Sequence, residues 1–67
     1  MFKKEKLQEF MEKEKLSWAR LGEQIGTSGT MVGYLLKGYK QPSVVLLRRI
    51  ADVMGCTMDE LVLKEER

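Results

Sequence analysis

The side chains best suited to bind another molecule lie on one side of a short segment between residues 29 and 37. Thr30, Tyr34 and Lys37 are spaced by four and three residues, so they share one face of a helix. Gly29 and Gly33 lie on the same side. Hydroxyl groups donate and accept hydrogen bonds, and an ammonium group donates them. Small and hydrogen-bonding residues in this pattern indicate a helix that lies against a partner.

Enzyme chemistry is not supported by the residue types. The chain has no histidine and one cysteine, Cys56, and its acidic residues are accounted for by surface patterning or helix capping. A lone cysteine excludes an internal disulfide, and we interpret it as core packing, with a redox role as the alternative. We therefore expect no enzyme activity, no cofactor, no metal site and no small-molecule ligand.

Length and composition predict a single all-helical domain spanning residues 1–67. The 67 residues are 43% hydrophobic, which is enough for a core, and a single proline with few alternating runs is typical of helices. A domain of this size buries only about 60% of the surface that its unfolded chain exposes. Its stability must therefore come from close helix packing or from a partner.

The net charge of +2 is small, but its distribution along the chain is uneven. Residues 16–42 carry Arg20, Lys37 and Lys40 against a single acidic residue, Glu23. This segment is compatible with a phosphate-facing surface, and equally with a solvated face. Because the sequence contains neither a span of eighteen apolar residues nor an apolar run after the N-terminal lysines, we expect a soluble, cytoplasmic protein without a membrane partner.

The binding face belongs to the second of two short helices joined by a tight turn, in a motif of about residues 17–38. Ser17 and Ser28 stand where a side-chain oxygen can cap a helix start. Gly26 and Gly38 stand where a helix can end in the left-handed conformation. The buried seam of the pair is expected to consist of Leu21, Ile25, Val32 and Leu35.

Three further helices are expected to complete the domain. The first runs over about residues 3–13, with Leu7, Phe10 and Met11 on its inner face, and Lys15 follows in a turn where glycine is common. Another runs over about residues 44–54 after the cap Ser43, and it is expected to bury Val44, Leu47, Ile50, Ala51 and Met54. The last begins at a capping box formed by Thr57 and Glu60, with Leu61 packed inside.

These residues resemble the helix-turn-helix of phage repressors and Cro-like regulators, the lambda-repressor-like or XRE type. The matching positions are Leu16-Ser17, Gly22, Gly26-Thr27-Ser28, Val32, Leu35, Gly38, Pro42-Ser43, Ala51, Met54-Gly55 and Asp59-Glu60-Leu61. They follow the family pattern in order and spacing over about fifty residues. The resemblance implies an all-α, five-helix lambda-repressor-like fold whose second motif helix enters the major groove of double-stranded DNA.

The resemblance also implies a set of DNA contacts. They are expected from Trp18, Ser28, Gly29, Thr30, Met31, Gly33, Tyr34, Lys37, Tyr39 and Lys40. Thr30 and Tyr34 are the expected base readers, and the two glycines would let the backbone come close to the groove. Trp18 either donates its indole N–H to a phosphate or covers the core, and Met31 either meets a thymine methyl group or packs partly in the core. Tyr39 and Lys40 lie in a loop that follows the phosphate backbone in relatives, or that is a plain polar loop.

Two departures from the family pattern carry expectations of their own. Relatives often pair an arginine in the first helix with a glutamate in the recognition helix, where this chain has Met11 and Leu36. Because an apolar pair avoids the desolvation cost of two buried ions, we expect these side chains to touch. Gly22 replaces an alanine common at the helix crossing and predicts a close approach of two backbones.

Surplus apolar residues in the last third of the chain suggest a contact between two copies. Val45, Leu46 and Val53 stand where relatives commonly have polar residues, and Val62 and Leu63 precede a charged end. Leu46, Val53, Val62 and Leu63 are therefore the expected homodimer interface. Their alternative role is to cap the domain's own core.

The function implied by the resemblance is a sequence-specific transcriptional regulator, expected to be a repressor that binds a palindromic operator as a dimer. The alternative is a protein-interaction module of the same fold, such as an antitoxin or an accessory regulator. The weakly basic recognition helix and the apolar surplus of residues 44–54 motivate this alternative.

Overall fold

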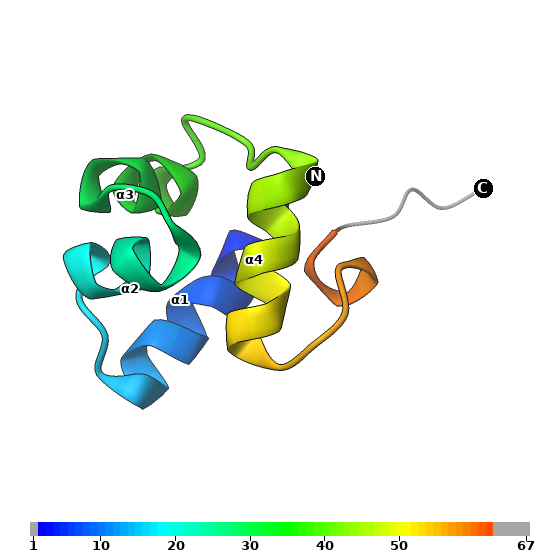
Figure 1. Ribbon diagram of the computed structural model, residues 1–67, viewed down its shortest axis with the longest axis horizontal. Helices are drawn as coiled ribbons and strands as arrows, with labels where there is room; N and C mark the ends of the chain where they lie inside the picture. The colour runs from blue at the N-terminus through cyan, green and yellow to red at the C-terminus, as the bar shows by residue number, and fades with distance from the viewer. Residues whose placement is uncertain (1, 63–67) are drawn as a thin grey trace.

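The computed structural model describes residues 2–62. It contains α1 (Lys4–Glu14), α2 (Trp18–Ile25), α3 (Gly29–Lys37), α4 (Val44–Met54) and a short 3₁₀ helix, η1 (Asp59–Leu61). Helices α2 and α3 lie side by side at one end of the molecule, and η1 lies at the opposite end, beyond α4 (Figure 1). This is the expected all-helical arrangement, with one correction to the helix count.

The fifth helix is a single 3₁₀ turn. Its capping box forms as expected, because the Glu60 carboxylate accepts hydrogen bonds from the Thr57 N–H and hydroxyl at 3.2 and 3.1 Å. The helix does not continue because Val62 is extended (φ −117°, ψ 129°) and forms an antiparallel bridge with Phe2. Pairing with the N-terminal segment therefore ends the helix after Leu61.

Side-chain caps begin the three central helices. The hydroxyl oxygens of Ser17, Ser28 and Ser43 accept hydrogen bonds from the backbone N–H three residues later, at 3.2, 3.1 and 3.2 Å. Each bond satisfies an N–H that has no partner within the helix. These three helix starts confirm the sequence prediction.

The turn between α2 and α3 depends on two glycines with different roles. Gly26 adopts the left-handed conformation (φ 76°) that ends α2. Gly22 lies in the middle of α2, where a Cβ atom would come within 2.8 Å of the backbone of Thr27 and Ser28. The close backbone approach predicted at Gly22 is therefore confirmed. At the end of α1 the same left-handed conformation is taken by Lys15 (φ 56°) without help from glycine.

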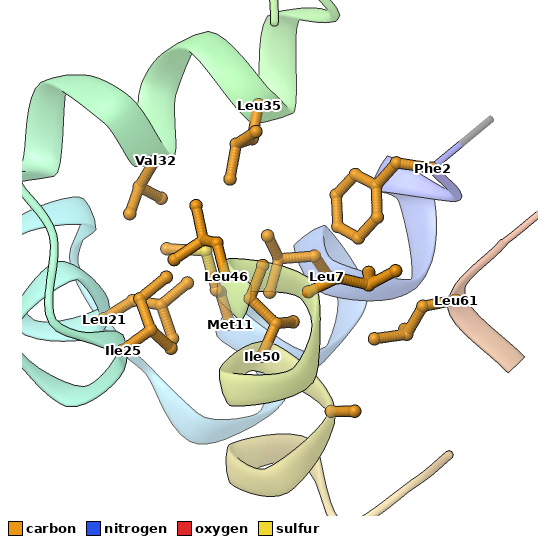
Figure 2. Close-up of a cluster of buried hydrophobic side chains, with 12 residues drawn as sticks. Phe2, Leu7, Met11, Leu21, Ile25, Val32, Leu35, Leu46, Ile50 and Leu61 are labelled. Atoms are coloured by element: carbon orange, nitrogen blue, oxygen red, sulfur yellow. The ribbon is translucent and has the colours of Figure 1, made fainter. Parts of the chain in front are cut away.

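One apolar core joins all the elements. Figure 2 shows side chains from α1, α2, α3 and α4 converging on it, together with Phe2 and Leu61. Its buried members are Phe2, Leu7, Met11, Leu21, Ile25, Val32, Leu35, Leu46, Leu47, Ile50, Ala51 and Leu61. The seam predicted for the two motif helices is a fully buried part of this core, so α3 is braced from behind by aliphatic side chains.

Phe2 is a core residue that the sequence did not single out. Its side chain is 7% exposed and lies next to Leu7 in Figure 2. Its N–H donates to Gln41 Oε1 at 2.9 Å, and the next N–H, of Lys3, donates to the Leu61 carbonyl at 2.7 Å. The N-terminal segment is thus attached both to the loop after α3 and to the turn of η1.

The inner face of α4 differs from the prediction. Val44, expected inside, is 73% exposed, whereas Leu46, expected outside, is 8% exposed. Leu46, Leu47, Ile50 and Ala51 form the buried face. At 100° per residue, Val44 lies about 90° from the centre of that face and Leu46 about 70°. Leu46 therefore packs in the domain's own core, and it is not available at the expected dimer surface.

Candidate nucleic-acid interface

The exposed face of α3 carries the three polar residues expected from their spacing. Thr30, Tyr34 and Lys37 are exposed, whereas Val32 and Leu35 on the opposite side are fully buried. The hydrogen-bonding side chains therefore point away from the core along the outer side of a nine-residue helix. A hydroxyl, a phenol and an ammonium group at this spacing can contact successive groups along a nucleic-acid groove.

Trp18 extends this face from the start of α2. Its indole ring lies over Gly33, where an added Cβ atom would come within 2.6 Å of ring atom Cζ3. The ring is still 45% exposed, so it both covers part of α3 and presents a surface to solvent. The ring therefore covers α3 at Gly33, and its contact with a phosphate stays a prediction. The Lys37 ammonium lies 5.7 Å from the centroid of this ring.

Aromatic and cationic side chains alternate around the C-terminal end of α3. The Lys37 ammonium lies 5.8 Å from the Tyr39 ring centroid, and the Lys40 ammonium lies 5.5 Å from that of Tyr34. The two tyrosine rings are 6.0 Å apart and tilted by 43°. Contacts of this kind hold each ammonium group in place at an exposed site. The two lysines are thus positioned next to the expected base readers.

The loop after α3 lies next to this cluster. Gly38 ends α3, and the Tyr39 N–H donates to the Tyr34 carbonyl at 2.9 Å. Tyr39 is 72% exposed, and Lys40 is exposed beside it. The loop therefore presents an aromatic ring and an ammonium group on the side of the molecule where α3 presents its polar face.

The two glycines of α3 make room for α2. A Cβ atom at Gly29 would meet the Ala19 backbone at 3.1 Å, and Gly33 is buried under the Trp18 ring. The sequence analysis assigned the space at both glycines to the groove of bound DNA. That assignment is wrong, because residues of α2 fill the space. Ser28 serves as the cap of α3 and is exposed. Met31 is partly buried against the core, as one of its two interpretations had it.

Met11 lies on α1 and Leu36 lies on α3. Met11 is buried in the core, Leu36 packs against that core, and both line one open groove beside Trp18. They are therefore not separately solvated. Their direct contact stays a prediction.

The residues expected at a dimer interface have different environments. Leu46 is buried, as described above, while Val53 and Val62 are partly buried against the core. Leu63 lies outside the described residues. Among residues 2–62, the large aliphatic side chains that are exposed are instead Val44 and Val45, at the start of α4.

Two titrating groups far from this face have perturbed pKa values. Hydrogen bonds from the backbone and side chain of Thr57 lower the pKa of Glu60. Burial raises the pKa of the Cys56 thiol, and the Glu60 charge adds to that effect. Within residues 2–62 the structure places no three metal-ligating side chains together, and none of the described helices is long and apolar enough to cross a membrane.

Comparison with known proteins places this geometry in a family. A helix-turn-helix family model matches residues 7–61. The P22 c2 repressor protein, solved in complex with the synthetic operator 9T in the presence of Tl⁺, superimposes with a TM-score of 0.85 at 21% sequence identity. The match covers 92% of this chain and 94% of that one. A search of curated proteins gives no match. The chain therefore belongs to the helix-turn-helix family, with the fold of a phage repressor domain.

Proposed function

We propose that this protein is a sequence-specific DNA-binding transcriptional regulator that acts in the cytoplasm as a repressor. The observation that carries the proposal is the outer face of α3, where Thr30, Tyr34 and Lys37 are exposed in one row on a helix braced from behind by Val32 and Leu35. A helix of this shape fits the major groove. The similarity to a repressor solved on operator DNA supports the same assignment.

The proposed division of labour follows from the side-chain chemistry. Thr30 and Tyr34 read base edges, because a hydroxyl can donate or accept a hydrogen bond and the threonine methyl group can meet a thymine methyl group. Lys37 and Lys40 contact phosphates, which position the protein without reading sequence. Trp18 packs on the sugar-phosphate backbone beside the start of α2, where its indole N–H can donate to a phosphate oxygen.

A dimer on a palindromic operator supplies the specificity that one domain lacks. Two polar readers on α3 give a single domain little base readout, so two domains on half-sites about 34 Å apart must combine their binding. Val44 and Val45 offer exposed aliphatic surface for the contact between copies, together with the partly exposed Val53 and Val62. Occupation of the operator then blocks access to the promoter.

Selection of bound fragments from a random pool of duplex DNA tests the proposal. We expect an enriched motif with two-fold symmetry and half-sites one helical turn apart. Enrichment of a single unpaired half-site would contradict the dimer, and no enrichment at low salt would contradict sequence-specific binding as a whole.

A protein-interaction role of the same fold, as in an antitoxin, is the second candidate. It is favoured by the two exposed valines at the start of α4, which the domain's own core does not use. Stable binding to the product of a neighbouring gene through Val44 and Val45, together with failure to retard any duplex at low salt, would support it over DNA binding.

A further inference from the structure

A groove lined by lysines lies next to the proposed DNA-binding face. It opens between the start of α1 and the end of α3 and has a volume of about 510 Å³. Lys3, Lys4, Lys6 and Lys37 line it, with Glu5 as the one acidic residue among its lining. Four lysines against one glutamate give the lining an excess of positive charge, which suits a polyanion.

Lys4 brings this groove directly to the recognition helix. A Cβ atom at Gly38 would lie 3.1 Å from the Lys4 Nζ, so the ammonium group lies against the backbone where α3 ends. The preceding residue, Lys37, lines the groove and also belongs to the cluster around Trp18 and Tyr39. Lysine side chains from the start of α1 and from α3 therefore line the same groove where α3 ends.

The N-terminal segment that carries these lysines is fixed in place. The buried Phe2 side chain anchors it in the core, and the Phe2 N–H donates to Gln41 Oε1 in the loop after α3. The Lys3 N–H donates to the Leu61 carbonyl from the other side. Lys3 and Lys4, both partly buried, are therefore held next to the loop. Binding an anion there requires little loss of chain entropy.

We propose that this groove binds the sugar-phosphate backbone of the same duplex whose major groove receives α3. Lys4 makes the central phosphate contact and Lys3 supports it, at a distance along the strand from the phosphates bound by Lys37 and Lys40. An ammonium group is a compact point charge that pairs with phosphate oxygens. The inference rests on the proposed function and adds a second phosphate-binding site to it.

The salt dependence of duplex binding tests the assignment. Each phosphate neutralised by the protein contributes about 0.9 to the slope of log K against log salt. We expect Lys4→Gln to reduce the slope by about that amount, and Lys4→Arg to keep it. Lys13→Gln is the matched control, since Lys13 lies in the last turn of α1, about 13 Å along the helix from Lys4, and is exposed. It removes the same charge and should leave the slope unchanged.

Ethylation interference on the duplex gives a second readout. Ethylating the phosphate that faces the groove should weaken binding of the wild-type protein and have no effect on Lys4→Gln. If Lys4 only holds the end of α3, Lys4→Gln should lower the melting temperature and weaken duplex binding by the same factor at all salt concentrations. The ethylation interference pattern should then be the same for the wild-type protein and the variant. That result would overturn the second site while leaving duplex binding intact. A wild-type protein that binds no duplex at low salt would overturn both proposals.

Discussion

The indole ring of Trp18 occupies the space that a side chain at position 33 would need. An added Cβ atom at Gly33 would lie 2.6 Å from ring atom Cζ3, closer than nonbonded carbon atoms approach. This contact joins the start of α2 to the middle of α3. The position of the exposed Trp18 ring therefore depends on a glycine of the recognition helix itself. Lys37, over the same ring, is positioned by it in turn.

Replacing Gly33 with alanine should therefore move Trp18 and destabilise the domain. Forcing an extra methyl group into a packed site costs about 1–3 kcal/mol. In a Trp18→Ala background the same change should instead stabilise α3 by about 0.5–1 kcal/mol, because alanine is the better helix residue once the ring is gone. Urea denaturation of the four proteins measures the coupling. Additive effects would show that the ring does not depend on Gly33.

The two proposed base readers can be tested by near-isosteric changes. Thr30→Val and Tyr34→Phe remove a hydroxyl group and keep the shape of the side chain. Each should reduce discrimination at its base pair by about 1–3 kcal/mol and leave binding to unrelated duplexes unchanged. Competition between the selected site and single-base variants measures this. Weakening that is equal on every sequence would assign the two residues to the phosphate backbone instead.

The sequence predicted most of the α2 and α3 geometry because local rules determine it. Serine caps and glycine ends depend on residues one to four positions apart, so Ser17, Ser28 and Gly26 could be interpreted without knowing the rest of the fold. The row of Thr30, Tyr34 and Lys37 follows from helical periodicity in the same way.

Contacts between distant segments could not be predicted in this way. The bridge from Phe2 to Val62 and the bond from Phe2 to Gln41 join residues sixty and thirty-nine positions apart, and no local pattern signals them. The bridge ends η1 after a single turn, and the bond to Gln41 holds the N-terminal segment whose lysines line the groove. The sequence interpretation assigned the space at Gly33 to a DNA groove, but its occupant is Trp18, fifteen positions away in the sequence.

Because Leu46 is buried and Val45 is exposed, truncating the two side chains should have different effects on stability. Leu46→Ala should destabilise the domain by about 2–5 kcal/mol, because it leaves a cavity in the core. Val45→Ala, on the exposed side of the same helix turn, should change stability by less than about 0.5 kcal/mol. Thermal or urea denaturation of dilute protein checks both. Similar small effects at the two positions would show that the Leu46 side chain is not buried in the core.

The hydrogen bonds between Thr57 and Glu60 make stability depend on pH in the acidic range. They lower the folded-state pKa of Glu60 below its ordinary value of 4.5, so the ionised form is favoured by folding. A group with a lowered folded pKa contributes stability above its unfolded pKa, and that contribution is lost as pH falls through the folded pKa. Wild-type stability should therefore fall as the pH drops below about 4.5 by more than that of Glu60→Gln, which cannot titrate.

Thr57→Val keeps the carboxylate but removes the hydroxyl bond, and it should give an intermediate dependence. Urea denaturation at a series of pH values measures the difference, and parallel curves for wild type and Glu60→Gln would show that the cap contributes nothing to acid stability.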